Sequence, residues 1–192
     1  MLGELVTAGK VRAIGTSTFS AVQLRDTLDT ATALGVAEPT SEQPPYSALA
    51  RGIERDVLPL CRTEDIGVIC WAPLNGGWLT GKYQRGADDP DSRANRQGEH
   101  FDHKDEAMRR EKVAAVDALL AVAGDVGLSL PQLALGFVLD DPAVTAAIIG
   151  PRTSAQLTEL LAAGAPTLPP GTRDRVDAIV APGRTINPYD AG

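Results

Sequence analysis

The sequence predicts an α/β fold in which four strands form a parallel sheet. Short segments rich in apolar and β-branched residues alternate four times with longer amphipathic segments along the 192 residues, the pattern of strand–helix–strand units. The length and the apolar content of 43% suit a single domain with a core of its own. Such units cross over with one hand, so the carboxyl ends of the strands should meet at one edge, where ligands bind in these folds.

The first strand–helix unit is expected to follow a short N-terminal helix. Met1–Gly9 is expected to be the end of a helix, and Val11–Gly15 a short strand. Ser20 can cap a helix at Ala21–Leu34, because its hydroxyl can accept from the first free backbone N–H groups. Apolar residues recur at helical spacing along that segment, and Gly35 stands where the helix would end.

The second unit combines an interrupted strand with a short helix. A strand is expected within Thr40–Ser47. Pro44 and Pro45 prevent it from continuing as an interior strand, since proline donates no hydrogen bond to a neighbouring strand. A helix is then expected at Ile53–Glu64, before the third strand at Val68–Ala72.

The remaining elements belong to the last two units. Residues 83–105 form a long, polar loop, a kind that is usually functional or disordered in a compact domain. Beyond it we expect helices at Ala107–Gly124 and Ser129–Leu139, a strand at Ala143–Gly150, helices at Ser154–Ala163 and Pro170–Val180, and an irregular tail over 181–192.

The stretch Gly67–Lys82 is the centre of this organisation. Its strand ends at Pro73, and the loop that follows contains Gly76, Gly77 and Gly81 before Lys82. Glycines let a backbone turn sharply or approach a ligand closely, and a lysine at the end of such a loop can meet an anion. An ordinary surface loop would also explain this composition, so the residues alone leave both interpretations open.

Two parallel architectures fit this order of elements. One is an open, doubly wound sheet, and the other is a barrel of which four strands would form half. No Gly-x-Gly-x-x-Gly follows the first strand, so the dinucleotide-binding fingerprint of the doubly wound folds is absent.

Composition excludes several classes of function. The net charge of −7 argues against general binding to nucleic acid or to anionic membranes, which requires a basic surface. Two cysteines, Cys61 and Cys70, suit a reduced, cytoplasmic protein, and Cys70 is expected to be buried. His100 and His103 form an isolated His-x-x-His, which lacks the further ligands that a metal site needs, so we expect no metal.

Four motifs resemble those of the aldo-keto reductases, and the branch they are most similar to contains bacterial enzymes related to potassium-channel β subunits. The motifs occur in the family's order and cover nearly the whole chain: Gly9–Ser17, Glu42–Ser47, Trp71–Tyr83 and Ile148–Leu157. Members of the family are (β/α)8 barrels, and such TIM barrels need about 250 residues. The resemblance therefore implies that residues 1–192 are the second half of a barrel, carrying its last four strands.

The same resemblance implies that the groups which transfer the proton are not in this chain. The family's catalytic aspartate, tyrosine, lysine and histidine belong to the first half of the barrel. We therefore assign no catalytic residue. Tyr46, Tyr83, Tyr189, Lys10 and Lys82 lack the context of the family's acid–base motif and are not expected to replace it.

What the resemblance does imply is most of an NADP(H) site. Ser17, Thr18 and Gln43 would bind the nicotinamide carboxamide, and Trp71 would stack on the nicotinamide ring. The segment that follows would hold the diphosphate through backbone N–H groups; it comprises Ala72, Pro73, Leu74, Asn75, Gly76, Gly77 and Leu79, with Lys82 adding charge. Arg93 would clamp the cofactor. Gly150 and Arg152 would lie at the 2′-phosphate, and Gln156 and Glu159 at the adenosine.

An independent physical argument points the same way. A dinucleotide carries several negative charges and needs cations and N–H donors at strand ends or helix N-termini. In an acidic chain, Lys82, Arg93 and Arg152 stand at or after such ends. The chain departs from the family's usual residues at Thr18, where asparagine or arginine is common, and at Leu160, where asparagine is usual.

The expected function is therefore that of an NADP(H)-dependent oxidoreductase that transfers hydride between the cofactor and a carbonyl or alcohol, present here as the half without catalytic groups. The alternative is an inactive module that binds a nucleotide or another protein, or the remnant of a truncated gene. A small carbonyl compound would be the substrate if a first half completed the barrel. Self-association is also expected, because the strands at Val11–Gly15 and Ala146–Gly150 would lie unpaired at the edges.

Overall fold

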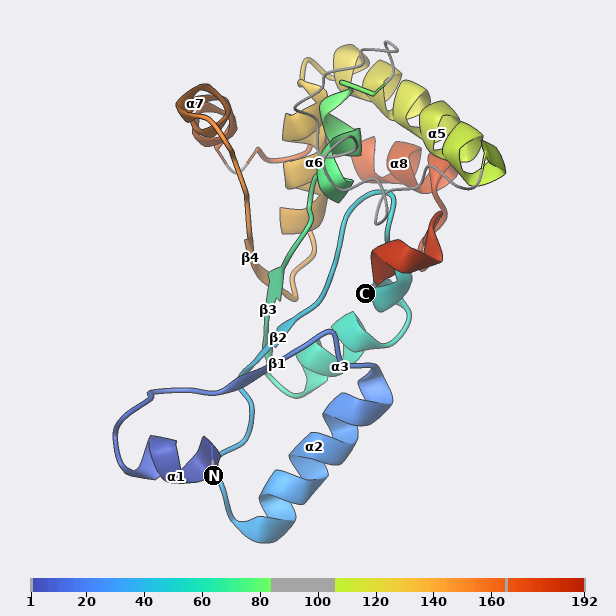
Figure 1. Ribbon diagram of the computed structural model, residues 1–192. Coiled ribbons are helices and arrows are strands. Elements are labelled where there is room, and N and C mark those ends of the chain that lie inside the picture. The colour runs from blue at the N-terminus through green and yellow to red at the C-terminus, as the bar shows by residue number, and fades with distance from the viewer. Residues whose placement is uncertain (1, 84–105, 165, 192) are drawn as a thin grey trace.

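A computed structural model describes residues 2–83, 106–164 and 166–191. Its four strands form one parallel sheet in the order in which they occur along the chain (Figure 1). The strands are β1 (Gly15–Ser17), β2 (Ser41–Gln43), β3 (Gly67–Cys70) and β4 (Val144–Ala147). A doubly wound sheet reverses its strand order at a switch point, whereas this order does not reverse. The prediction of half a (β/α)8 barrel is thus confirmed.

The helices follow the predicted pattern with one main exception: the segment expected as one helix at Ile53–Glu64 divides into a 3-10 turn, Gly52–Glu54, and a shorter α-helix, Val57–Thr63. Their bounds are α1 (Leu2–Thr7), α2 (Ala21–Leu34), α3 (Val57–Thr63), α5 (Glu106–Asp125), α6 (Leu130–Leu139), α7 (Ser154–Ala163) and α8 (Thr172–Ile179), with short 3-10 turns η1 (Gly52–Glu54), η2 (Asn75–Thr80) and η4 (Pro188–Ala191). Ser20 caps α2 through a reciprocal pair of hydrogen bonds with Gln23, and Gly35 ends it with a φ of 62°. Ser129 and Gln132 cap α6 in the same way.

The first strand begins four residues later than the sequence predicts. Val11–Gly15 was the expected range, but β1 is Gly15–Ser17. The first hydrogen bond to the neighbouring strand runs from the Thr40 amide to the Ile14 carbonyl. Residues before Ile14 therefore have no neighbour to pair with, because β2 has not yet begun, and a β-branched composition alone does not make them a strand.

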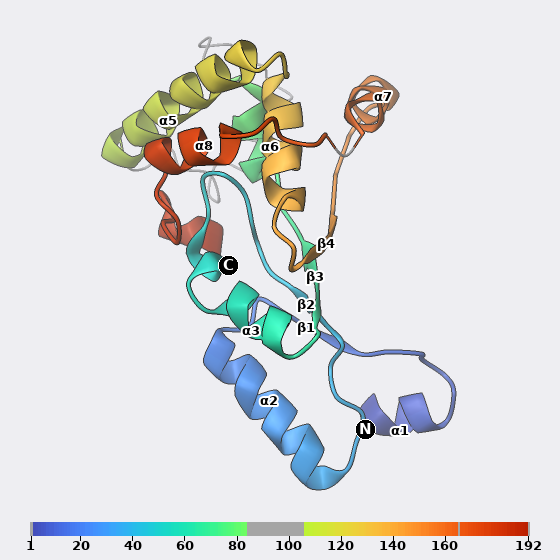
Figure 2. The ribbon, with the colours of Figure 1, turned by 180° about the vertical axis from the view of Figure 1, so that it is seen from behind.

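The two faces of the sheet differ in what covers them. Side chains alternate between faces along each strand, and Glu42, Val68 and Cys70 are fully buried on the face that packs against helices. Figures 1 and 2 show α2 and α3 on this same side of the sheet. The opposite face is formed largely by small and polar residues and one isoleucine: Gly15, Ser17, Ser41, Gln43, Gly67 and Ile69.

On this opposite face, called the bare face below, the backbones of β1 and β2 lie in close contact. A Cβ atom on Gly15 would lie 2.7 Å from the Ser41 carbonyl oxygen. Glycine is therefore required at this position, because no real Cβ approaches an oxygen so closely. In a closed barrel this face would be the interior.

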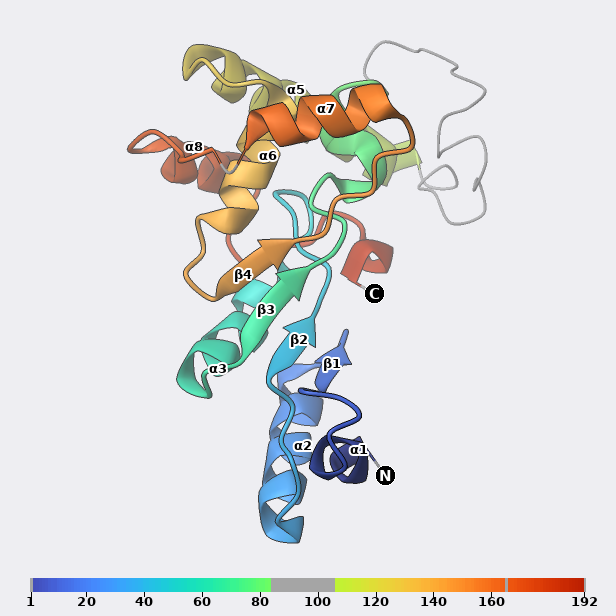
Figure 3. The same cartoon turned by 90° about the vertical axis from the view of Figure 1, so that its left-hand side faces the viewer.

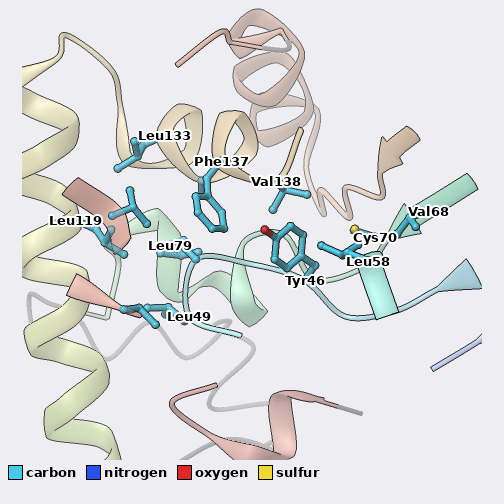
Figure 4. Close-up of a cluster of buried hydrophobic side chains, with 14 of the residues drawn as sticks. Tyr46, Leu49, Leu58, Val68, Cys70, Leu79, Leu119, Leu133, Phe137 and Val138 are labelled. Atoms are coloured by element: carbon cyan, nitrogen blue, oxygen red, sulfur yellow. The ribbon is translucent and has the colours of Figure 1, made fainter. Parts of the chain in front are cut away.

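The core lies between the sheet and α6, on the carboxyl side of the strands. Figure 4 shows Phe137 of α6 directed toward Tyr46, with Leu79 and Leu119 nearby. The Tyr46 and Phe137 ring centroids are 5.6 Å apart, within the range of favourable aromatic pairs. Figures 1 and 2 both show α5, α6 and α8 gathered beyond the carboxyl ends of the strands. The site described below therefore sits on a packed support.

Within the described part of the chain, β1 and β4 are the outer strands of the sheet, as the sequence predicts, and each pairs with one neighbour. β4 is Val144–Ala147 rather than the longer strand expected. Helix α7, which follows β4, is exposed along most of its length, including Leu157 and Leu161.

No single helix in the described part of the chain is long and apolar enough to cross a membrane. Helices α5 and α6 pass a length and composition test only as a pair bent by 91°, and both bury many residues in the core.

Candidate functional site

The carboxyl ends of β1 and β2 are joined by two hydrogen bonds at Gln43. The Ser17 hydroxyl donates to the Gln43 carbonyl oxygen at 3.0 Å, and the Thr18 amide donates to the same oxygen at 3.2 Å. Thr18 has a φ of 59°, which is uncommon for a residue with a side chain. The chain thus turns sharply away as soon as β1 ends, leaving Ser17 and Gln43 side by side.

Three of the predicted nicotinamide-binding residues share the bare face of the sheet. Ser17 is the register partner of Gln43. Two residues beyond Gln43, Pro45 pairs with Trp71 in a parallel bridge. Paired residues in a parallel sheet point to the same side, and residues two apart do so as well. Ser17, Gln43 and Trp71 therefore lie on one face, at the carboxyl ends of three adjacent strands. Figure 3 looks onto this face, and no helix of the described part of the chain covers these strand ends.

Trp71 is fixed by backbone hydrogen bonds on both sides. Its amide donates to the Pro44 carbonyl at 3.0 Å, and its carbonyl accepts from the Tyr46 amide at 3.2 Å. The indole is half-buried. Ala72 follows with a φ of 54° and redirects the chain into the loop, while Pro73 is buried. A half-buried aromatic ring on a fixed backbone can present one face to a flat ligand.

The loop after β3 is folded tightly around the carbonyl of Leu74. The amides of Gly77 and Leu79 both donate to this oxygen, at 2.9 and 3.2 Å. Gly76 and Gly77 have φ values of 64° and 103°, which glycine adopts without strain. Leu79 is completely buried and anchors the turn in the core. A diphosphate at this loop would have to share the Gly77 and Leu79 donors with Leu74.

The end of the loop places a cation against its turn. A Cβ atom on Gly77 would lie 3.0 Å from the Cε and 3.1 Å from the Nζ of Lys82. The ammonium also lies 5.0 Å from the centre of the Tyr83 ring, and the Tyr83 hydroxyl donates to the Gly76 carbonyl at 3.4 Å. The lysine that the sequence singled out is therefore adjacent to the glycine turn.

The side-chain oxygen of Asn75 is buried and accepts no hydrogen bond from the described residues. The residue is 4% exposed and has a φ of 48°. Its Nδ2 donates to Asp190 Oδ2 at 3.0 Å and faces Ser47 Oγ at 3.4 Å. Its Oδ1 has no hydrogen-bond partner in the described part of the chain. Such an atom costs free energy unless a bound molecule or water donates to it.

The segment after β4 leads into the N-terminus of α7. Thr153 caps this helix by accepting from the Gln156 amide, and the Gln156 side-chain oxygen accepts from the Arg152 amide at 2.8 Å. The Gln156 side-chain oxygen is therefore occupied by the Arg152 amide. Gly150, Arg152 and Glu159 are exposed, and the space where Gly150 would carry a side chain is open.

The predicted residues thus divide into two groups. Those after β1, β2 and β3 lie on adjacent strands and their loop, and those after β4 lie along one turn and the start of α7. Arg93, His100 and His103 lie outside the described residues. A cavity of about 280 Å³ lies beside the ends of β1 and β2, and Thr18 is the predicted residue that lines it. The other predicted residues in the described part of the chain do not line this cavity, so it is not the candidate site.

Tyr46 is placed in a structural role. Its ring is fully buried, and its hydroxyl donates to Glu54 Oε1 at 2.6 Å while accepting from Arg173. Burial, and then the hydrogen bond to Glu54, raise the pKa of this phenol far above its ordinary value. The Tyr46 hydroxyl is thus bound to Glu54 and Arg173 within the core.

Buried charges support the same region. Arg51 is 1% exposed and pairs with Glu54 at 2.9 Å and Asp177 at 2.7 Å. The Phe137 ring lies between the guanidinium groups of Arg51 and Arg173, at 4.9 and 4.7 Å. This network joins the loop after β2 to α6 and α8 and fixes the support under the site.

The sequence did not reveal the part played by the C-terminal segment. The tail from Ala181 was expected to be irregular, but η4 forms at Pro188–Ala191, and Asp190 contacts both Asn75 and Lys112. No local pattern points to such contacts, because they depend on where the chain returns. A search of the described residues finds no group of histidine, cysteine and carboxylate side chains able to hold a metal.

Comparisons with known proteins agree with these observations. The sequence model of the Aldo/keto reductase family matches residues 1–181. A probable voltage-gated potassium channel subunit beta from Oryza sativa is 34% identical over 169 residues, or 86% of this chain and 51% of that protein. The aldo-keto reductase YhdN of Bacillus subtilis is 35% identical over 83% of this chain and 46% of its own. An NADH-specific methylglyoxal reductase of Escherichia coli is 30% identical over 85% and 47%.

The chain spans about half the length of the curated relatives it matches.

Proposed function

Because the chain belongs to the aldo/keto reductase family, we propose that it forms the dinucleotide-binding part of an NADP(H)-dependent oxidoreductase acting on carbonyl or alcohol groups. The observation that carries this proposal is the placement of Ser17, Gln43 and Trp71 on one bare face. The glycine loop and Lys82 continue directly from the third of these strands. A planar ring and an anionic group would thus find fitting surfaces next to each other.

The described residues fit a dinucleotide in three respects. The Lys82 ammonium lies against the glycine turn at Gly77, which places a cation beside the backbone proposed to meet the diphosphate. Asn75 Oδ1 is buried and lacks a donor that a bound molecule could supply. Arg152 and Gln156 stand at the N-terminus of a ten-residue helix, where backbone N–H groups and the helix dipole favour negative charge.

Each group then has a definite task. Ser17 and Gln43 orient a carboxamide, and Trp71 blocks one face of the ring beside it. Lys82 and the turn at Gly76 and Gly77 neutralise the diphosphate. When bound, the dinucleotide supplies the hydride, while the protein supplies binding and orientation.

Proton transfer is assigned to groups outside these residues. Tyr46 is committed to Glu54 and Arg173, and Tyr83 to the Gly76 carbonyl. We therefore expect the 192-residue chain to bind the cofactor without reducing carbonyl compounds by itself. Isothermal titration with NADP⁺, alongside an assay of carbonyl-dependent NADPH oxidation, tests both parts. Absence of binding would contradict the first part, and turnover above that of a mock preparation would contradict the second.

Preference for NADP over NAD is proposed to depend on Arg152. A charged hydrogen bond to the 2′-phosphate is worth about 1.5–3 kcal/mol in favourable cases. Arg152→Ala should therefore weaken NADP⁺ binding by about ten- to a hundredfold and leave NAD⁺ binding unchanged. Arg175→Ala, which removes an exposed arginine on α8, is the matched control and should change neither. Equal losses for both dinucleotides in Arg152→Ala would contradict the assignment.

A second proposal concerns association through the open sides of the sheet. β1 and β4 expose unpaired strand edges, and Ile148, Leu157 and Leu161 beside β4 are 42%, 40% and 63% exposed. Open edges and apolar side chains favour pairing with another chain. We expect dimers or larger species in light scattering after size-exclusion chromatography. A monodisperse monomer with slow exchange at the outward-facing edge amides, those of Ser17 and Thr145, would contradict this.

A further inference from the structure

The C-terminal segment beyond the family match lies against the glycine loop. The family model ends at residue 181, but the chain continues and packs back onto the molecule. The Ile186 amide donates to the Leu49 carbonyl at 3.0 Å, and the Gly52 amide donates to Thr185 Oγ1 at 3.0 Å. These bonds fix the segment along the loop after β2 and bring η4 next to η2.

One carboxylate oxygen of this segment joins two other elements. Asp190 Oδ2 lies 3.0 Å from Asn75 Nδ2 in η2 and 2.7 Å from Lys112 Nζ in α5. The Lys112 side chain is fully buried, and that of Asp190 is 24% exposed. The Lys112 ammonium also lies 5.5 Å from the centre of the Trp78 ring. The Asp190–Lys112 ion pair therefore contacts the glycine loop at two residues, Asn75 and Trp78.

Asn75 is the residue at which this contact affects the loop. Its left-handed backbone conformation is one that asparagine tolerates better than most residues. With Nδ2 held by Asp190, the side-chain amide has one orientation, and the orphan Oδ1 is directed elsewhere. The next two residues, Gly76 and Gly77, form the turn proposed to meet the diphosphate.

We propose that Asp190 is a positioning residue that holds the glycine loop in its anion-binding conformation. It does so through Asn75, with Lys112 neutralising its charge, and it does not touch the ligand itself. The ligand chemistry concerned is the diphosphate of a dinucleotide, so the binding role rests on the proposed function. The contact itself is a property of the chain without ligand.

The first measurement needs no ligand. Amide hydrogen exchange is compared between the wild-type chain and Asp190→Asn, with Asp125→Asn as the matched control, because Asp125 forms an exposed ion pair with Arg175. We expect Gly77 and Leu79 amides to exchange about tenfold faster in Asp190→Asn, since local opening exposes their bonds to Leu74, and to be unchanged in Asp125→Asn. Unchanged exchange in Asp190→Asn would overturn the proposal, whatever the chain binds.

The second measurement separates a positioned loop from general destabilisation. Binding of NADP⁺ is compared with binding of adenosine 2′-monophosphate, which has no diphosphate. Asp190→Asn should weaken NADP⁺ about tenfold, the size of one charged hydrogen bond, and leave the monophosphate within about twofold. Equal losses for both would assign Asp190 a merely structural role and overturn the proposal.

A double-mutant comparison makes the path through Asn75 testable. Glycine adopts the left-handed conformation at position 75 without a side chain, so Asn75→Gly removes the partner of Asp190 and keeps the turn. In that background Asp190→Asn should have no further effect on the exchange of Gly77 and Leu79. Additive effects would overturn the proposed path. If the wild type binds no dinucleotide, the proposed function fails, while the exchange data still decide the role of Asp190.

Discussion

Gly77 is the position at which the geometry of the glycine loop can be tested most sharply. It has a φ of 103°, a conformation that costs a residue with a side chain about 1–2 kcal/mol. In addition, the new Cβ would lie 3.0 Å from Lys82 Cε and 3.5 Å from the Tyr83 hydroxyl, so the lysine must move. Gly77→Ala should therefore destabilise the chain by about 1–2 kcal/mol and displace the loop cation.

The matched control adds the same methyl group where it does no harm. Gly124 lies near the end of α5, and nothing lies within 4 Å of the position its Cβ would take. Gly124→Ala should stabilise the chain by about 0.5–1 kcal/mol, because alanine is the better helix former. Calorimetry should show melting temperatures moving in opposite directions, by about 2–4 °C per kcal/mol. A Gly77→Ala chain as stable as the wild type would refute the described loop.

Three further results are expected from the buried part of the molecule. Burial raises the pKa of Cys61 to about 11 and that of Cys70 to about 12. Iodoacetamide at pH 8 should therefore label both thiols only after denaturation. Rapid labelling of the native chain would contradict the structure. Since the folded-state pKa lies above the unfolded one, stability should also fall as the pH rises above about 8.5. Arg51→Met removes the cation that neutralises Glu54 and Asp177, and should lower the free energy of unfolding in urea by about 3–5 kcal/mol. Arg175→Met, at an exposed ion pair, should lower it by less than about 1 kcal/mol. Equal losses of stability would argue against the buried network.

The helices were predictable because their signals are local. Ser20 and Ser129 each lie three residues before a glutamine that completes a capping box, and Gly35 ends α2 as expected. Both caps depend only on residues within one turn of the helix. The ranges of α2 and α7 therefore agree with the sequence at both ends.

The strands were predictable in order but not in length. β1 begins at Gly15, and β4 ends at Ala147, because a strand extends only as far as its neighbour provides partners. A bulge between Val68 and Ile69 also shifts the register against β4. No pattern within the segments themselves shows where pairing begins or stops.

The candidate site divides in a similar way. Gly77 and Lys82 could be singled out because glycines and a cation after a strand are visible in the sequence, whereas Trp71 was singled out by the resemblance to the aldo-keto reductases. That Asp190 reaches Asn75 could not, because the two residues are distant in sequence and meet only after the C-terminal segment returns. Likewise, the sequence shows Tyr46 but not that its hydroxyl is occupied by Glu54.

Residue-resolved NMR of the amide and indole groups during a titration with NADP⁺ tests the central claim most directly. We expect the largest shifts at Gln43, the Trp71 indole, Gly76, Gly77 and Arg152, which lie at the carboxyl edge of the sheet and the start of α7. Shifts confined to α2 and α3, or no shifts at saturating NADP⁺, would contradict the claim that this edge is a dinucleotide site.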